Sequence, residues 1–203
     1  MPKHFEPRER EIIYNTLIEE GKKSWQRYGI RRTNVEDLAK AAGISKGTFY
    51  SFFKSKELFF MEILEISQAQ IKGRLMDVVL NQGGNPEERF VNALMQAYGE
   101  IKHNPWLVNL MTDKGEYAYL FRKLPQEKVE QHIVGDDEDT SEFMKLLGID
   151  SSHVENETIS AALRGLFFVL LHEQEVGKEH VDKVFKLLLE GLAQRIFRGD
   201  GDD

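Results

Sequence analysis

The stretch from Thr33 to Lys56 constrains the fold more than any other, because it combines a helix-capping signal, a short apolar face and a glycine stop. Thr33 and Glu36 have the T-x-x-E spacing of a capping box at a helix start. The apolar residues that follow recur at helical spacing and end at Gly43, which readily takes the left-handed conformation that stops a helix. Ser45 is a favourable cap for a second helix. The pattern predicts two short helices joined by a tight turn.

Two short helices joined by a glycine-containing turn are the helix-turn-helix pattern, whose second helix enters the major groove of DNA. The same geometry also occurs as an ordinary corner in all-α proteins, so the pattern alone leaves both interpretations open. Lys46 and Thr48 stand at the start of the second helix, where base edges are read. Gly47 between them lacks a side chain, which lets the backbone approach DNA closely.

Two further residues have the chemistry to bind phosphate. Tyr50 can donate its hydroxyl group to a phosphate oxygen. Lys56 stands at the start of the next helix, where an ammonium group and backbone N–H groups together bind phosphate. In the N-terminal arm, Arg8 and Arg10 have the charge to reach the DNA backbone, although a basic chain start is also common in proteins that do not bind DNA.

The residues of this stretch also resemble a known family. The run Asp37-Leu38-Ala39-Lys40-Ala41-Ala42-Gly43-Ile44-Ser45-Lys46-Gly47-Thr48-Phe49-Tyr50, followed by Phe53-Lys54-Ser55-Lys56-Glu57-Leu58, is similar to the N-terminal domain of the TetR family of bacterial repressors. The resemblance covers residues 12–64. It implies an all-α fold, with a three-helix helix-turn-helix DNA-binding domain at residues 1–55 and a larger helical ligand-binding and dimerisation domain at residues 56–203.

The resemblance also implies a function. The protein is expected to bind a palindromic double-stranded DNA operator as a homodimer and to be released by a small amphipathic or aromatic effector. Phe52 departs from the family, which often has His or another polar aromatic residue there, so that phosphate contact is lost or Phe52 turns inward. Motif and resemblance together give the predicted DNA-binding residues: Thr33, Ser45, Lys46, Gly47, Thr48, Tyr50 and Lys56.

The charge of the chain is distributed unevenly. The net charge is −7, but residues 1–60 carry 12 Lys and Arg against 8 Asp and Glu, a net charge of +4, and residues 61–203 carry −11. A basic end on an acidic body is typical of a protein that holds DNA at one end. Ordinary variation in surface charge gives the same imbalance, so the asymmetry supports the DNA interpretation without deciding it.

Composition excludes other classes of protein. The chain has no cysteine, which excludes disulfides, thiol nucleophiles and cysteine metal sites. Its N-terminus is polar and lacks the apolar core of a signal peptide, and its longest apolar run, 166–171, is too short to cross a bilayer. We therefore expect a cytoplasmic protein without a membrane partner.

Helical periodicity predicts the remaining elements, and no stretch has the pattern of a strand. A long helix from Lys56 to Leu80 is the expected lever between ligand and DNA in the family interpretation. Gly21 lies on the apolar stripe of the first helix, so another helix should pack closely against it. The acidic run 135–139 is expected to be a mobile loop, because its charges repel one another. The other expected helices are 8–28, 86–103, 106–111, 116–124, 143–147, 155–175 and 180–197.

The C-terminal region offers candidates for a ligand pocket and for a dimer interface. Aromatic residues at helical spacing are more often core than pocket, while His172 follows an apolar run and could be a buried hydrogen-bonding group facing a cavity. The ligand candidates are Tyr98, Trp106, Met111, Phe121, Phe168 and His172. Small and apolar residues on two helix faces fit a four-helix dimer interface or packing within one subunit. The dimer candidates are Ala161, Gly165, Leu187, Leu188 and Gly191.

The alternatives are an α-helical enzyme and a DNA-binding protein without ligand sensing. A di-iron site needs two Glu-x-x-His motifs, and the chain has one, at Glu100 and His103. No zinc protease motif, glycine-rich phosphate loop or Gly-x-Ser-x-Gly elbow is present. We expect no catalytic residues, no metal site and no cofactor. The acidic body and the long aromatic-rich C-terminal region argue against a purely architectural DNA-binding protein.

Overall fold

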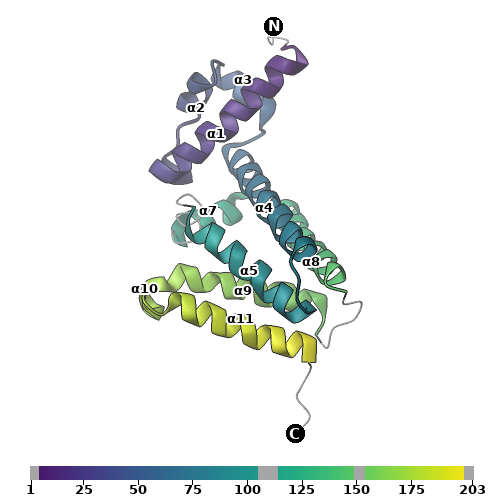
Figure 1. Cartoon of the computed structure of the whole chain (residues 1–203). Helices are drawn as coiled ribbons and strands as arrows, with labels where there is room; N and C mark the ends of the chain where they lie inside the picture. Colours follow the sequence, from purple (N-terminus) through teal and green to yellow (C-terminus); the bar gives the residue numbers. More distant parts are fainter. Residues whose placement is uncertain (1–4, 105–113, 149–153, 199–203) are drawn as a thin grey trace. The chain divides into compact units, whose positions relative to one another are not determined.

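The described part of the chain is helical, as predicted. A computed structural model describes residues 5–104, 114–148 and 154–198, and no strand occurs among them (Figure 1). None of the helices in these ranges has the length and apolar character that a membrane span requires. The chain divides into two compact units: residues 1–69 with 113–124, and residues 70–112 with 125–203. The domain boundary between residues 55 and 56 stays a prediction.

The first unit contains the predicted helix-turn-helix. Its helices are α1 (Pro7–Arg32), α2 (Val35–Ala41), α3 (Lys46–Phe52), the beginning of α4 (Lys56–Asn81) and α7 (Lys114–Lys123). Aromatic side chains form its core: the ring of Phe59 lies 4.8 Å from that of Phe53 and 5.3 Å from that of Phe49. Trp25 of α1 meets Phe60 of α4 edge to face at 5.2 Å. Such rings bury a large apolar area, so they hold α1 and α3 on α4.

Helix α1 packs closely on α4 at Gly21, as the sequence predicted. A Cβ on Gly21 would lie 2.4 Å from Cδ1 of Ile63 and 2.5 Å from Cζ of Phe59. Heavy atoms of two side chains do not approach to these distances, so glycine is required for the contact between the helices.

The predicted capping box at Thr33 and Glu36 is wrong, whereas the cap at Ser45 is confirmed. Helix α1 extends to Arg32 across a break at Gly29 (φ 76°, ψ 168°), so Thr33 closes α1 and its hydroxyl donates to the Gly29 carbonyl at 2.7 Å. Asn34 caps α2 instead, because its side chain accepts the Glu36 N–H at 3.0 Å. Ser45 caps α3 by accepting the Thr48 N–H at 3.1 Å.

The second unit is a helical bundle. It contains the rest of α4, α5 (Pro86–Lys102), α8 (Gln126–Leu146), α9 (Asn156–Phe167), the 3₁₀ helix η1 (Phe168–His172), α10 (Glu173–Val176) and α11 (Val181–Arg198). Helix α11 packs on α5 and α9, and α8 packs on α9. The expected helix 155–175 is interrupted, because η1 follows α9 after Phe167. The expected helix 106–111 lies outside the described residues.

The acidic run 135–139 is not a loop. It lies inside α8, which ends at Leu146 and so includes the piece expected at 143–147 except for Leu147, its C-cap. Arg164 of α9 places its guanidinium 3.2 Å from Asp137 and 3.5 Å from Asp136, and Lys72 of α4 pairs with Asp139. These cations offset the repulsion on which the loop prediction rested.

Candidate nucleic-acid interface

Helix α3 is amphipathic in the sense that DNA reading requires. Phe49 is fully buried and anchors the helix on the core, while Ser45, Lys46, Gly47 and Tyr50 are exposed. A Cβ on Gly47 would meet Oγ of Ser45 at 3.8 Å, an ordinary contact, and no closer atom of the described residues. Packing among the described residues therefore does not explain why this position is a glycine.

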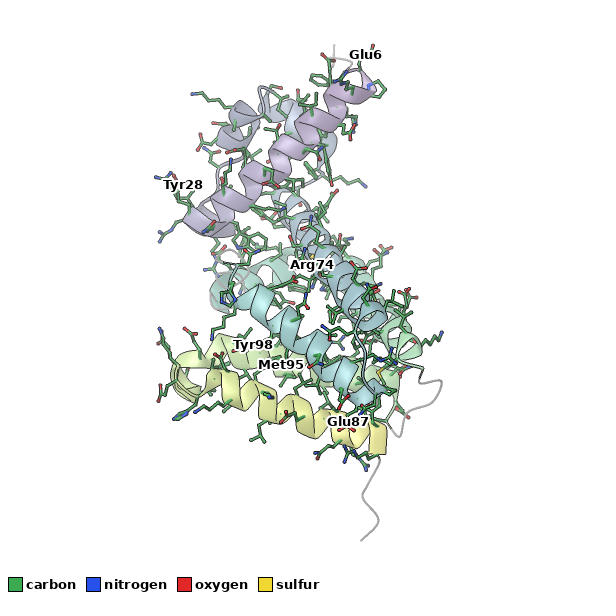
Figure 2. All side chains as sticks on the ribbon, in the orientation of Figure 1. Glu6, Tyr28, Arg74, Glu87, Met95 and Tyr98 are labelled. Carbon is green, nitrogen blue, oxygen red and sulfur yellow. The ribbon has the colours of Figure 1, made fainter. Side chains whose placement is uncertain are left out.

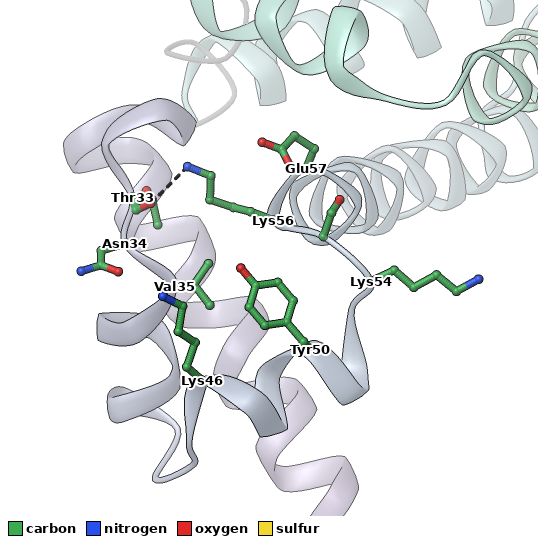
Figure 3. Close-up of a pocket in the computed structure, with 9 residues that line it drawn as sticks. Thr33, Asn34, Val35, Lys46, Tyr50, Lys54, Lys56 and Glu57 are labelled. Carbon is green, nitrogen blue, oxygen red and sulfur yellow. Dashed lines mark hydrogen bonds between the residues drawn. The ribbon is translucent and has the colours of Figure 1, made fainter.

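An open, basic pocket lies beside α3. Its volume is about 380 Å³, and Figure 3 shows Lys56 between Glu57 on one side and Tyr50 and Lys46 on the other. Four of the predicted DNA-binding residues share this pocket, and Ser45, Gly47 and Thr48 form the adjoining start of α3. The lining residues are Thr33, Asn34, Val35, Lys46, Tyr50, Lys54, Ser55, Lys56 and Glu57.

The structure adds two polar residues that sequence reasoning missed. Asn34 caps α2, and Lys54 lines the pocket although Figure 3 shows its side chain pointing away from Lys56 and Tyr50. The signal for Lys54 was its place in the basic turn between α3 and α4. Asn34 was hidden, because the capping-box pattern pointed to its neighbour.

Lys56 is fixed by the corner between α1 and α2. Its Nζ atom donates to the carbonyl oxygens of Arg31 and Thr33, both at 3.3 Å (Figure 3 draws the second). An ammonium group has three donors, so these two bonds do not exhaust it, and a phosphate oxygen can accept from it as well. Thr33 is buried and its hydroxyl hydrogen points to Gly29, so its hydroxyl is committed inside the protein.

Lys46 forms an ion pair with Glu36. Its ammonium group donates to Glu36 of α2 at 3.0 Å, and this hydrogen bond raises the pKa of Lys46 above its ordinary value. Both side chains are largely exposed, so the pair is weak and Lys46 can exchange it for a base or phosphate.

Phe52 supports an arginine. The guanidinium carbon of Arg10, from α1, lies 4.4 Å above the centre of the Phe52 ring. A cation held over a ring keeps its N–H donors available at its edges. Arg10 therefore presents N–H donors beside Phe52 of α3.

The ligand candidates do not share one environment. Tyr98, labelled on α5 in Figure 2, is buried and stacks on Phe185 at 4.1 Å. It donates its hydroxyl to Asp182 of α11, and burial and this bond raise the pKa of Tyr98. Phe121 belongs to α7, and Phe168 is exposed. The expectation of a buried His172 is wrong, because its side chain is exposed beside Glu175. Trp106 and Met111 lie outside the described residues.

The five dimer candidates all lie on exposed positions of α9 and α11. Leu187 and Leu188 are exposed by 68% and 48%, high values for leucine. A Cβ on Gly165 or Gly191 would meet no described atom within 4 Å, and Ala161 is exposed beside them on α9. Packing within the described part of one protomer therefore does not explain these small residues. The described residues also contain no group of three or more His, Asp and Glu placed to hold a metal ion.

Residues 17–63 match the family described as "Bacterial regulatory proteins, tetR family". The chain is 33% identical over 88 residues to the HTH-type transcriptional repressor KstR2 of Mycobacterium tuberculosis, which is 43% of this chain and 44% of that protein. It is 28% identical over 114 residues to the HTH-type transcriptional repressor NemR of Escherichia coli, 56% of this chain and 55% of that protein. The matched region spans about half the length of these relatives.

The likeness in fold extends further along the chain. The crystal structure of the transcriptional regulator FadR from Bacillus subtilis in complex with stearoyl-CoA superposes with a TM-score of 0.63, covering 93% of this chain and 100% of that one at 16% identity. At this identity the likeness establishes the fold.

Proposed function

This chain belongs to the TetR family of bacterial regulatory proteins, and on that premise we propose that it is a transcriptional repressor that binds operator DNA as a homodimer and releases it when a small molecule binds. The observation that carries the proposal is the open, lysine-lined pocket beside the exposed first turn of α3. Such a surface pairs a base-reading helix with a phosphate site.

The first turn of α3 and the pocket beside it are proposed to contact different parts of the DNA. The first turn of α3 enters the major groove, and the absent side chain at Gly47 lets the helix backbone approach the bases. The pocket beside it receives a phosphate, which Lys56 and Tyr50 bind by charge and hydrogen bonds. Phosphate contacts fix the register, and contacts from Lys46 and Thr48 select the sequence.

The homodimer supplies two such reading heads for the two halves of a palindrome. We assign its interface to α9 and α11, supported by the exposure of Leu187 and Leu188 and by the small residues beside them. Helices that present small and apolar residues in this way pack into four-helix interfaces.

The effector is proposed to be amphipathic, and it acts by population shift. It can release DNA only in so far as it binds the released state more tightly, and a difference of ~3 kcal/mol corresponds to ~150-fold in DNA affinity. FadR of Bacillus subtilis holds stearoyl-CoA, so a series of acyl-CoA thioesters of increasing chain length is the first to test.

The deciding experiment is selection of genomic fragments by the purified protein at about 150 mM salt, where non-specific binding is weak. We expect a short palindrome, bound by wild-type protein and by Lys23→Ala but not by Lys46→Ala; Lys23 is an exposed lysine of α1 that pairs with Glu20. A folded dimer that enriches no sequence, even after refolding to remove bound ligand, would contradict the proposal. DNA affinity that no amphipathic molecule changes would leave a DNA-binding protein without ligand sensing.

A further inference from the structure

A buried carboxylate from a distant part of the chain holds the corner between α1 and α2. Glu116 of α7 is only 8% exposed, and its Oε2 atom accepts the backbone N–H of Arg31 at 3.1 Å. Its Oε1 atom lies 3.4 Å from Nε of the same arginine. One carboxylate thus engages both the main chain and the side chain of Arg31.

The break at Gly29 explains why Arg31 needs this partner. Gly29 has φ 76° and ψ 168°, so the helix is interrupted and a new turn begins after it. The first N–H groups of a helical turn have no partner in the turn before them, and a carboxylate at that end satisfies them and complements their partial charge. A Cβ on Gly29 would lie 3.0 Å from Cδ of Glu116, so the glycine also makes room for the carboxylate.

Further contacts extend the same junction. Nη2 of Arg31 donates to the Gly115 carbonyl at 2.5 Å, and its guanidinium lies 5.1 Å over the ring of Tyr119. The hydroxyl of Tyr119 donates to Glu57 of α4 at 3.0 Å. Burial and this bond to Glu57 raise the pKa of Tyr119 above its ordinary value. Helix α7 therefore contacts both the end of α1 and the first turn of α4.

These two segments are the walls of the phosphate pocket. Arg31 donates its backbone N–H to Glu116, and its carbonyl oxygen accepts a hydrogen bond from Nζ of Lys56. Glu57, the acceptor of Tyr119, lines the pocket next to Lys56 (Figure 3). A chain of contacts runs from Glu116 through Arg31 to the ammonium group proposed to bind phosphate.

We propose that Glu116 is a positioning residue for DNA binding: it fixes the Arg31 carbonyl and thereby the ammonium group of Lys56. The inference rests on the proposed function, and it adds that α7, which follows α4 by more than thirty residues, is part of the DNA-binding apparatus without touching DNA. Loss of Glu116 lets the corner after Gly29 move, and Lys56 then loses two fixed acceptors.

The test is a double-mutant cycle of Glu116→Ala and Lys56→Ala, read as operator affinity and as its salt dependence. Lys56→Ala is expected to reduce the slope of log affinity against log salt by about one phosphate contact. Glu116→Ala is expected to weaken binding about tenfold and to reduce the slope similarly, and the double variant to bind about as weakly as Lys56→Ala alone, since both act on one contact. Glu116→Gln keeps an acceptor for the Arg31 N–H and is expected to lie between wild type and Glu116→Ala.

The matched control is Glu62→Gln, which removes the charge of another paired carboxylate in the same unit, the acceptor of Tyr14. Its salt slope should equal that of the wild type. Thermal unfolding of each variant corrects affinities for the folded fraction. The inference would be overturned, and the proposed function left standing, if folded Glu116→Ala had the operator affinity and salt slope of the wild type. The same would follow if the losses of binding free energy in the two single variants added fully in the double variant. Wild-type protein that binds no operator would overturn the proposed function and the inference with it.

Discussion

Gly47, in the first turn of α3, is a position where a substitution should change DNA affinity without disturbing the fold. A Cβ on Gly47 fits the described structure, so Gly47→Ala is expected to leave the fold intact and to raise the free energy of unfolding by up to about 0.5–1 kcal/mol, since glycine is the poorer helix former. Operator affinity should fall about tenfold or more, because the added methyl group stands between backbone and bases. Thermal unfolding and DNA titration measure the two effects.

The control for this variant is Gly73→Ala, an exposed helical glycine of α4 whose Cβ would meet no described atom within 4 Å. It should gain similar stability and keep full operator affinity. Equal affinity for Gly47→Ala and wild type would show that close approach at this position is not needed.

Arg10 and Phe52 form a pair whose effect on DNA binding is testable separately. Arg10→Ala is expected to lower the salt slope by about one, since one phosphate contact is lost. Phe52→Ala should weaken operator binding because Arg10 loses the ring that holds it. The double variant should therefore bind the operator only slightly more weakly than Arg10→Ala. Arg27, which lies 5.2 Å over Tyr28, provides the control: Arg27→Ala should not change the slope. A slope unaffected by Arg10→Ala would exclude this phosphate contact.

At the residue scale the sequence predicted the features that local chemistry decides. The cap at Ser45, the turn at Gly43 with φ 68° and the close contact at Gly21 are confirmed. The error at Thr33 has a physical cause: α1 continues past Gly29, and a sequence pattern does not reveal that a helix resumes after a glycine break.

Among the elements, the packing of α1 on α4 depends on Gly21. Gly21→Ala would place a methyl group 2.4 Å from Ile63, so it is expected to lower the free energy of unfolding by about 1–3 kcal/mol through overpacking. Urea denaturation followed by circular dichroism measures the change. Gly135→Ala on α8, where no described atom lies within 4 Å, should be neutral or stabilising. Wild-type stability in Gly21→Ala would mean that the two helices separate easily.

Helices α5 and α11 are joined by Asp182, which accepts hydrogen bonds from Lys102 and Tyr98. The bond to Lys102 is the largest cause of a lowered pKa of Asp182, followed by the bond to Tyr98. A carboxyl group whose pKa is lowered on folding stabilises the fold above its unfolded pKa, and this stability is lost as the pH falls through the folded value.

Asp182→Asn should therefore cost ~0.5–1 kcal/mol at neutral pH, a modest amount because the carboxylate is half exposed. The difference from wild type should narrow below about pH 4, near the ordinary pKa of aspartate. Urea denaturation at a series of pH values measures it. A difference that stays constant down to pH 2 would assign the effect to packing rather than to charge.

The elements that sequence reasoning misjudged depend on partners far away in the chain. The run 135–139 is helical because cations from α4 and α9 meet it, and neither Lys72 nor Arg164 is near it in sequence. The expected helix 155–175 has uniform helical periodicity, so its pattern does not show the tightening into η1 after Phe167.

For the whole molecule, the proposed dimer depends on the exposed leucines of α11. Leu187→Asp is expected to convert the dimer to a monomer, because it places a charge in an apolar interface, and to weaken operator binding by at least ~100-fold through loss of the second reading head. Light scattering measures the mass, and DNA titration measures the affinity. Leu80→Asp on α4 changes another leucine, 62% exposed, and should remain dimeric. A monomeric wild type would contradict the interface, as would a dimeric Leu187→Asp.

The helical class and the helix-turn-helix could be predicted from local pattern, because helix periodicity and capping act within a few residues. The junction of α7 with α1 could not. Arg31 and Glu116 are 85 residues apart. No sequence pattern around an arginine that follows a glycine break indicates which distant carboxylate will pair with it. The same limit applies to the ligand candidates, whose spacing does not distinguish Tyr98 in a core from an aromatic side chain in a pocket.

The place of α7 in the first unit bears on how this gene can be recombined. A reading head that ended with residue 69 would leave Arg31 without Glu116 and Glu57 without Tyr119. Grafting the first 69 residues onto another regulator would therefore transfer base preference but leave the corner between α1 and α2 less rigid. Residues 113–124, or a carboxylate of the other regulator that accepts the Arg31 N–H, would be needed to restore it. The first unit consists of two segments that are far apart in the sequence, residues 1–69 and 113–124. We expect substitutions in one segment to be accompanied by compensating substitutions in the other as sequences diverge.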